Sequence, residues 1–505
     1  MNRATKIIAV AACAAVVAAV PAFAACSSGT YVTSIEATDG GFLINYSDGT
    51  TKELSSSGNC VSSVEKTGET AEGEIYTVFY SDGTSLDITV PSGENGVSVN
   101  DIYNEYVNQT GDDITFADFV AKYLTLGEDG VAASINYCLQ SSMKLYCEFI
   151  TPQYSAMGWP LGVNTSVYTG AAIIYDMDKS QDGYTYIVTN YHVVYNTNAI
   201  ESENGGSKIA NKIVGYLYGS EDTPQSAGTD NKGYTQYSYG DYAIPLEYVG
   251  GSINYDVAVL RASTEDILAV NEYACEVELA DEYYVGETAI AIGNPEDAGL
   301  SVTRGVISTV NEQISLKIDN VARIYRSMRI DTPLYSGNSG GGLFNAEGKL
   351  IGITNSGNSE DQNINYAVPL EIVTGVANNI IYFYNDGNSD TSGLNTPKFG
   401  LSVSSSNSKY IYDETVGYGE IYESVTVNSV VSESIAEKCG VETGDVILAI
   451  SVNGVEKTIE RAYDIEDLLF TLRPGDTVAF TVERGGENVT TESATLEAGN
   501  FELVG

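Results

Sequence analysis

The chain has 505 residues but only one histidine, His192. Imidazole is the side chain that ordinarily titrates near neutral pH, so any imidazole acid–base chemistry must use His192. A single histidine also excludes metal sites built from several imidazoles. The seven cysteines show no metal-ligand spacing. No metal and no organic cofactor is implied by the sequence.

Basic residues are scarce: 24 lysines and arginines stand against 68 aspartates and glutamates, a net charge of −44. An acidic surface is repelled by phosphate backbones, which makes nucleic acid a poor partner. Hydrophobic residues make up 43% of the chain, enough for packed cores. The length predicts several domains.

Long apolar runs are missing after the first twenty residues. Arg3 and Lys6 precede the apolar run Ile7–Val20, which is short for a membrane span. A basic start followed by a short apolar run is typical of a signal peptide. We therefore expect residues 1–25 to direct export, and no transmembrane helix in the mature protein.

Two cleavage signals follow that run. Ala22-Phe23-Ala24 fits ordinary signal cleavage, which would give a secreted protein. Phe23-Ala-Ala-Cys26 resembles a bacterial lipobox. We favour a lipid on Cys26 that anchors the protein to the extracytoplasmic face of the bacterial cell membrane. This anchor would be its only contact with a membrane.

Besides Cys13 in the signal peptide and Cys26, five cysteines remain: Cys60, Cys138, Cys147, Cys275 and Cys439. Pairing of Cys138 with Cys147 stays open, and unpaired thiols are our expectation.

Three short segments carry chemically useful residues. His192 follows Val188-Thr-Asn-Tyr, Asp256 begins Asp-Val-Ala-Val-Leu, and Ser339 lies in Gly-Asn-Ser-Gly-Gly, with intervals of 64 (256 − 192) and 83 (339 − 256) residues. A serine hydroxyl needs an adjacent base to become a nucleophile, and the base needs a carboxylate to hold its tautomer. Each residue alone has a structural explanation, but their order predicts a catalytic triad.

The glycines beside Ser339 let the backbone turn sharply. We expect the turn Gly337-Asn338-Ser339 to form an oxyanion hole, with the N–H groups of Gly337 and Ser339 as its donors.

These segments resemble the HtrA/DegP family. The resemblance also rests on Ala291-Ile-Gly-Asn-Pro295, Val302-Thr-Arg-Gly-Val-Ile-Ser308, Gly348-Lys-Leu-Ile-Gly-Ile353 and Ile364-Asn-Tyr-Ala-Val-Pro369. It implies a serine endopeptidase that hydrolyses misfolded or damaged proteins, in a family that commonly forms homotrimers. It also implies that Thr354, Asn355 and Ser356 border the specificity pocket. Gly342 departs from the family, which usually has proline there.

Residues 398–493 resemble a PDZ domain. They include an expected helix over Ala462–Leu472 and a closing strand over Thr477–Arg484. PDZ domains bind peptide C-termini by adding the peptide as a strand and holding its carboxylate in a loop. The candidate carboxylate loop is Phe399-Gly400-Leu401.

The expected fold is mostly β: a small N-terminal β-hairpin repeat region, a chymotrypsin-like double β-barrel and an α+β PDZ domain. The near-identical segments Tyr46-Ser-Asp-Gly-Thr50 and Tyr80-Ser-Asp-Gly-Thr84 indicate the hairpin repeat. Residues 196–241 are expected to form a surface insertion. The expected divisions are 1–25 signal peptide, 26–91 hairpin region or spacer, 92–129 linker with short helices at 101–107 and 115–124, 130–375 protease, 376–397 helix end and linker, 398–493 PDZ domain, and 494–505 tail.

Two alternative functions stay open. One is a peptide-binding chaperone or scaffold with an inactive protease fold. The other is a protease that processes a single surface partner. Either would use protein or peptide partners rather than nucleic acid.

Overall fold

The computed structural model divides into two compact units, residues 1–137 with 346–349, and residues 138–345 with 350–505. The signal peptide, Cys26 and the helices expected at 101–107 and 115–124 lie outside the described residues, except for Val107. The structure describes residues 32–38, 41–46, 51–55, 61–70, 73–80, 85–91, 107, 128–318, 321–358, 361–386, 393–413 and 418–504.

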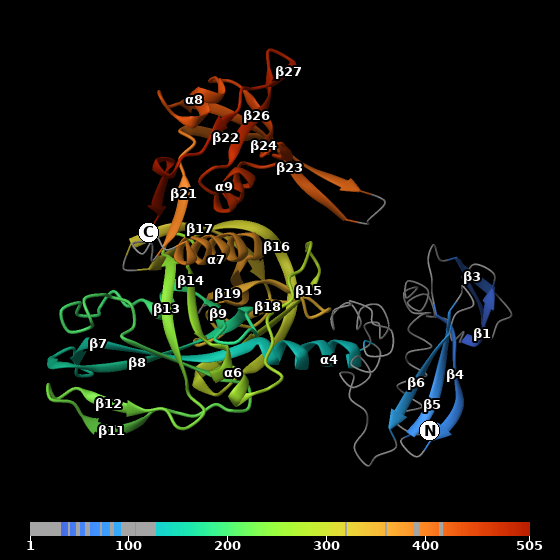
Figure 1. Ribbon diagram of the computed structural model, residues 1–505, viewed down its shortest axis with the longest axis horizontal. Helices are drawn as coiled ribbons and strands as arrows, with labels where there is room; N and C mark the ends of the chain where they lie inside the picture. The colour runs from blue at the N-terminus through green and yellow to red at the C-terminus, as the bar shows by residue number, and fades with distance from the viewer. Residues whose placement is uncertain are drawn as a thin grey trace. The chain divides into compact units, whose positions relative to one another are not determined.

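The repeat region forms two three-stranded antiparallel sheets, one from each copy of the repeat. In Figure 1 the second sheet is visibly twisted. Each Asp-Gly pair falls between the last two strands of its sheet, as a hairpin signal predicts. The strands are β1 (Val32–Thr38), β2 (Gly41–Tyr46), β3 (Thr51–Ser55), β4 (Val61–Thr70), β5 (Gly73–Tyr80) and β6 (Ser85–Pro91).

The first barrel follows helix α4 (Glu128–Cys138) and the 3₁₀ turn Leu139–Ser141. Its strands close in the order β10-β13-β14-β9-β8-β7. Val257–Leu260 on β14 are all fully buried, which explains why this strand reads as a continuous apolar run. The strands are β7 (Ser142–Tyr154), β8 (Pro160–Met177), β9 (Tyr184–Thr189), β10 (Lys212–Leu217), β13 (Ile244–Ser252) and β14 (Val257–Ser263).

The expectation of a surface insertion over 196–241 is partly wrong. Residues 212–217 are the barrel strand β10, and Ile213 and Leu217 lie in the barrel core. They pair with β7 and β13, so the core needs them. The rest of the segment is peripheral and includes a small hairpin, β11 (Gln225–Thr229) with β12 (Thr235–Ser238).

The second barrel closes in the order β15-β16-β17-β20-β19-β18. Helix α6 (Thr264–Val270) lies between the barrels in sequence, and α7 (Leu370–Asn385) follows the last strand. Ile372, Val376 and Ile380 of α7 are buried at intervals of four residues, so one face of this helix is apolar. The strands are β15 (Thr288–Gly293), β16 (Ser301–Ile318), β17 (Val321–Ile330), β18 (Gly342–Phe344), β19 (Leu350–Asn358) and β20 (Asp361–Pro369).

The C-terminal domain is a sheet in the order β22-β23-β24-β26-β27 with two short helices. The expected helix and closing strand are confirmed as α9 and β26. The edge strand β22 pairs only with β23. The elements are β21 (Leu394–Pro397), β22 (Leu401–Asp413), β23 (Tyr418–Val430), α8 (Ile435–Cys439), β24 (Val446–Val452), β25 (Val455–Thr458), α9 (Ala462–Thr471), β26 (Thr477–Arg484), β27 (Glu487–Thr490), β28 (Ala494–Thr495) and β29 (Phe501–Val504).

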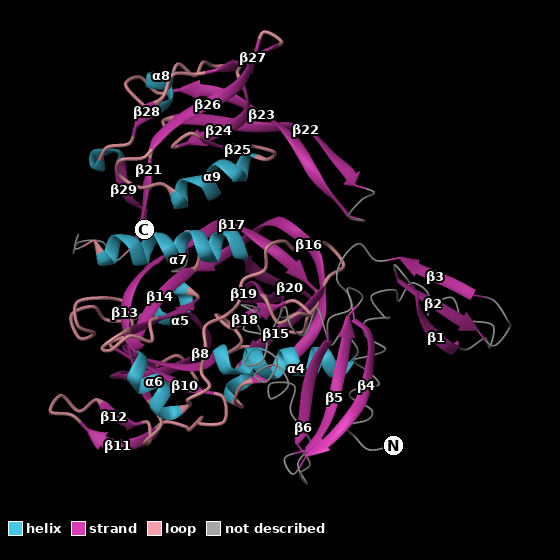
Figure 2. Ribbon diagram, turned by 45° about the vertical axis from the view of Figure 1, so that its right-hand side comes forward, coloured by secondary structure: helices cyan, strands magenta, loops and turns pink. Residues whose placement is uncertain are grey.

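Strand β29 pairs antiparallel with β21, so the two ends of this domain are joined by a two-stranded ribbon. The domain also contacts α7 through α9, which lies next to α7 in Figure 2. The Phe470 ring packs at Gly375, and Asn379 donates a 2.9 Å hydrogen bond to the Phe470 carbonyl. Beside this contact, Arg326 of β17 forms a bidentate ion pair with Asp467 of α9.

Within the described residues, no helix is both long enough and apolar enough to cross a bilayer. The mostly β double-barrel fold and the C-terminal α+β domain expected from the sequence are confirmed.

Candidate active site

His192 lies in a single helical turn, α5 (Tyr191–Val194), immediately after β9. Thr189, the last residue of β9, fixes the end of the strand by donating a 2.7 Å hydrogen bond to the Ala171 carbonyl of β8. The imidazole therefore projects from a rigid strand end and lines a cleft of about 780 Å³.

Asp256 lies just before β14 and is fully buried. One carboxylate oxygen is 2.7 Å from His192 Nδ1 and accepts a 2.9 Å hydrogen bond from Asn355 Nδ2. The other accepts the His192 backbone N–H at 2.9 Å. Asp256 has φ +54°, a strained conformation for a non-glycine residue, which an Asn190 side-chain bond to its carbonyl helps to hold.

The surroundings of His192 act on its pKa in opposite directions. Burial lowers the pKa, because a charged imidazolium is poorly solvated away from water. The charge of Asp256 and its hydrogen bond raise it and prevail, so the pKa lies above the ordinary imidazole value. The contact with Asp256 also favours the tautomer with its proton on Nδ1, which leaves Nε2 to accept a proton.

Ser339 completes the group, but its hydroxyl donates a 2.9 Å hydrogen bond to the Asn355 carbonyl. A hydroxyl has one proton to donate. In this conformation Ser339 is therefore not hydrogen-bonded to His192 as a donor, although both side chains line the same cleft. Asn355 contacts both sides of the site, because its amide holds Asp256 and its carbonyl holds Ser339.

The turn before Ser339 is shaped by two carbonyl groups that accept hydrogen bonds from neighbouring segments. The Ser336 carbonyl accepts the Glu296 N–H at 2.7 Å. The Asn338 carbonyl accepts the Thr354 hydroxyl at 2.6 Å and the Gly341 N–H at 3.0 Å. In a trans peptide the N–H points opposite to the carbonyl. The N–H groups of Gly337 and Ser339 therefore point away from these anchors, as the two donors of an oxyanion hole require.

Gly337 is required by this geometry. Its φ is +98°, and a Cβ there would lie 2.1 Å from the Asn294 carbonyl. The Asn338 N–H is used within the turn, where it donates to the Tyr335 carbonyl at 3.0 Å.

The loop that holds Ser336 is itself fixed by a buried cation. Lys144 of β7, only 2% exposed, forms a 2.8 Å ion pair with Asp297. The same carboxylate oxygen accepts the Tyr146 hydroxyl at 2.7 Å. Asn294 is held by Thr169, which accepts its side-chain N–H at 2.6 Å. These contacts fix the loop 294–299, whose Glu296 N–H reaches the Ser336 carbonyl beside Gly337-Asn338-Ser339, the turn expected to form the oxyanion hole (here the oxyanion turn). No motif in the sequence marked Lys144 or Asp297 for this role.

The residues expected to border the specificity pocket separate in the structure. Asn355 lines the cleft, whereas the fully buried Thr354 braces the oxyanion turn. The Ser356 side chain lies outside the described residues. The cleft wall is completed by Leu334 and Tyr335 and by Leu316–Ile318 at the end of the β16–β17 hairpin.

The candidate carboxylate loop lies before the edge strand β22. Gly400 has φ +73°, and a Cβ there would meet the Ser434 side chain at 2.2 Å. The Phe399 ring is buried against Phe480 with 5.5 Å between ring centroids. The Phe399 and Gly400 carbonyls accept hydrogen bonds from Ala436 and Val431 inside the domain, while Leu401 begins β22.

The pairing of Cys138 with Cys147 does not occur. Cys147 is a free thiol inside the first barrel, and burial raises its pKa to about 12. Among the described residues, no group of three or more histidine, cysteine, aspartate or glutamate side chains could hold a metal ion.

Comparison with known proteins agrees with the two domains. A model of the trypsin-like peptidase domain matches residues 170–353, and a model of the PDZ domain matches residues 397–495. The chain is 27% identical over 336 residues to the serine protease Do-like HtrA of Lactococcus lactis subsp. lactis (strain IL1403), covering 64% of this chain and 69% of that protein. It is 26% identical over 336 residues to the serine protease Do-like HtrA of Bacillus subtilis (strain 168), covering 65% of this chain and 63% of that protein. A solved structure of the HtrA-type protease AlgW with decapeptide has 21% identity and a TM-score of 0.42, covering 72% of this chain and 98% of that one.

Proposed function

Because this chain is a homologue of the HtrA/DegP serine proteases, with a trypsin-like peptidase domain and a PDZ domain, we propose that Ser339, His192 and Asp256 are its catalytic triad. The observation that carries this assignment is the 2.7 Å contact between His192 Nδ1 and the buried Asp256, beside Ser339 in one cleft.

The reaction begins when the Ser339 hydroxyl turns from the Asn355 carbonyl to His192 Nε2. His192 takes the proton as Ser339 attacks the peptide carbonyl, and Asp256 stabilises the imidazolium that forms. The negative charge on the substrate oxygen is met by the N–H groups of Gly337 and Ser339, with Asn338 between them. His192 then protonates the leaving amine, and water releases the acyl group from Ser339 by the same steps in reverse.

The substrates in this proposal are misfolded or damaged extracytoplasmic proteins. The PDZ domain would bind peptide C-termini along the edge strand β22, with the carboxylate held by the loop Phe399-Gly400-Leu401. Cleavage specificity would depend on Asn355, Ser356 and the cleft wall. The protein would act at the outer face of the cell membrane, anchored through Cys26, and the homotrimer of the family stays part of the proposal.

The first test is Ser339→Ala with a fluorophosphonate probe on the intact protein. We expect probe labelling to vanish and turnover to fall by about 10⁴–10⁶-fold, because the attacking oxygen is removed. Thermal unfolding checks that the variant is folded. Near-normal cleavage by the purified variant would exclude Ser339, and an unlabelled, inactive parent protein would favour the scaffold alternative.

A second test concerns the substrate class. Unfolded and folded forms of the same proteins are digested and the products sequenced. Preferential cleavage of unfolded forms at many sites supports quality control. Cleavage at one site of a single surface protein would instead support a dedicated processing protease.

A third test concerns the PDZ domain. Peptides that end in an apolar residue should bind the intact protein, and amidation of the C-terminus should weaken binding by about tenfold or more, since the loop N–H groups lose a charged acceptor. Equal affinity for free-acid and amidated peptides would rule out carboxylate capture.

A further inference from the structure

Residues 149–175 contain no charged side chain, although the chain as a whole carries a net charge of −44. These 27 residues (175 − 149 + 1) cover the end of β7 and nearly all of β8, which continue from the first barrel as a two-stranded ribbon (Figure 1). Glu148 and Asp176 flank this uncharged segment in the sequence. The ribbon is therefore a neutral projection on an acidic protein.

The tip of the ribbon exposes large apolar side chains. Met157 is 87% exposed, and Trp159, the only tryptophan in the chain, is 70% exposed. Tyr154 and Leu161 beside them are also mostly exposed. Such a group of exposed apolar side chains on a water-facing surface marks an interaction site.

The tip has a defined shape. Ser155 accepts the Gly158 N–H with its carbonyl at 2.8 Å and the Trp159 N–H with its side chain at 3.1 Å. The Ser155 N–H donates to the Trp159 carbonyl at 2.8 Å. Gly158 adopts φ +79° to close the turn. Met157 and Trp159 are thus presented by a closed turn.

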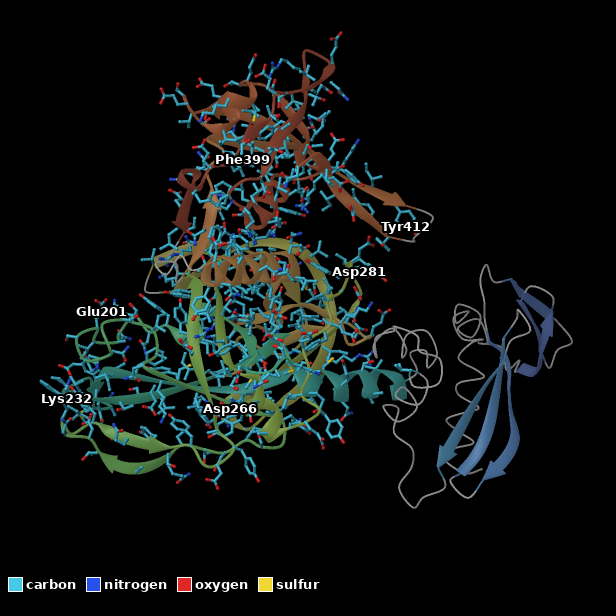
Figure 3. All side chains as sticks on the ribbon, in the orientation of Figure 1. Glu201, Lys232, Asp266, Asp281, Phe399 and Tyr412 are labelled. Atoms are coloured by element: carbon cyan, nitrogen blue, oxygen red, sulfur yellow. The ribbon has the colours of Figure 1, made fainter. Side chains whose placement is uncertain are left out.

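The lower part of the ribbon is braced by neutral groups only. Gln153 donates to Thr151 Oγ1 at 3.0 Å and to Ser166 Oγ at 2.9 Å. Asn164 exchanges two hydrogen bonds with Thr235 of the neighbouring hairpin β11–β12. Lys232 of that hairpin, labelled in Figure 3, is neutralised by Glu203 at 2.7 Å.

We propose that the tip of the ribbon, residues 154–163, inserts into the interfacial layer of a lipid bilayer. Tryptophan and tyrosine prefer this layer because their rings are apolar and their N–H and O–H groups stay hydrated. Bacterial bilayers carry anionic lipids that repel acidic surfaces. An uncharged tip avoids this repulsion.

Insertion of the tip would also set the position of the cleft. Thr169 lies on β8 and lines the active-site cleft. A strand rises about 3.3 Å per residue, so Thr169 lies roughly 30 Å along the ribbon from the tip. The tip contact does not depend on the assignment of Ser339 or on a lipid at Cys26.

Trp159 gives a direct test, because all tryptophan emission of the intact chain comes from the proposed contact. Vesicles of phosphatidylcholine with phosphatidylglycerol should shift this emission to the blue, and brominated phosphatidylcholine should quench it. Unchanged emission on vesicles with which the protein co-sediments would overturn the proposal, because another part of the chain would then hold the membrane.

The variant Met157→Glu/Leu161→Glu puts two charges at exposed positions and keeps the fluorophore. We expect vesicle partitioning reported by Trp159 to fall at least about tenfold, since apolar burial is lost and charge repulsion added. Val455→Glu, at the exposed start of β25 in the PDZ domain, is the control and should behave like the parent. A blue shift that grows with protein concentration without lipid would reject the bilayer in favour of a second copy.

Discussion

His192 makes opposite pH demands on activity and stability. In the proposed mechanism His192 is the base and must be neutral, so we expect activity to be lost as pH falls through the pKa of His192. That pKa is raised in the folded protein, because Asp256 outweighs burial. A pKa that is higher in the folded than in the unfolded protein contributes to the stability of the fold. This contribution is complete at pH values below the unfolded-state pKa and is lost as the pH rises through the folded-state pKa. The His192–Asp256 contact is therefore strongest where the enzyme is least active.

The midpoint of this titration can be measured without assignment, since the chain has one imidazole. We expect an NMR midpoint above the ordinary value of about 6.5, and an acid limb of kcat/KM at the same pH. Asp256→Asn should lower the midpoint, because burial then acts alone. If the kinetic limb differed from the NMR midpoint by much more than about one unit in a folded protein, another group would set the activity.

Asn355 shows what a motif does not reveal at the residue scale. The order of His192, Asp256 and Ser339 predicts which residues meet, since the chemistry requires these residue types. The contacts of Asn355 with Asp256 and with Ser339 depend on a strand of the second barrel reaching across both. Asn355 comes close to Asp256 and Ser339 only because the two barrels pack together. The sequence therefore indicates Asn355 as a pocket residue but does not reveal its hydrogen bonds to these two residues.

At the scale of elements, the loop 294–299 couples the first barrel to the turn that we propose as the oxyanion hole. Lys144 reaches Asp297 from β7, and Glu296 then holds the Ser336 carbonyl. Asp297 has a lowered pKa despite burial, because Lys144 and Tyr146 stabilise its charged form. The loop therefore keeps a charged anchor at neutral pH.

We predict that Lys144→Met lowers kcat by about tenfold to a hundredfold, because loss of a full oxyanion donor costs about 10²–10³-fold. KM and the His192 titration should change little, since neither the cleft wall nor Asp256 is touched. Lys212→Met is the matched control: Lys212 also lies on a barrel strand and pairs with Glu148, but it is half exposed. Equal effects of the two substitutions would show that Lys144 acts through general stability alone.

Elements with a clear period of apolar residues could be predicted from the sequence. Elements whose burial depends on pairing with strands distant in the sequence could not. Helix α9 and strand β26 occupy the expected residues within one position, because their apolar spacing and flanking turns are local signals. Strand β10 was missed inside a polar stretch, because only its pairing with β7 and β13 makes it a core strand.

At the scale of the whole molecule, the ion pair between Arg326 and Asp467 joins the second barrel to the PDZ domain. Both side chains are about nine-tenths buried. Burial raises the pKa of Asp467 to about 6, while the guanidinium of Arg326 opposes this rise. Removal of one partner would leave a buried charge without compensation.

We predict that Arg326→Met destabilises the contact between the domains by about 3–5 kcal/mol, and that Arg326→Met/Asp467→Leu regains most of this loss. Calorimetric unfolding of the intact chain, together with the Asp467→Leu single variant, completes the double-mutant cycle. Additive losses in the double variant would mean that the two side chains do not interact in solution. Lys398→Met, at an exposed pair with Glu502, should change stability by less than about 1 kcal/mol.

The ribbon formed by β21 and β29 has a consequence for how the chain is made. Strand β29 begins 107 residues (501 − 394) after β21, so the first half of this ribbon is synthesised long before its partner exists. Both barrels can complete their hydrogen bonding before β29, the partner of β21, has been synthesised. Strand β21 can pair with β29 only after the whole sheet of the PDZ domain has been synthesised. During synthesis, the nascent chain therefore passes through a stage in which the complete double barrel is joined to the PDZ domain through an unpaired β21.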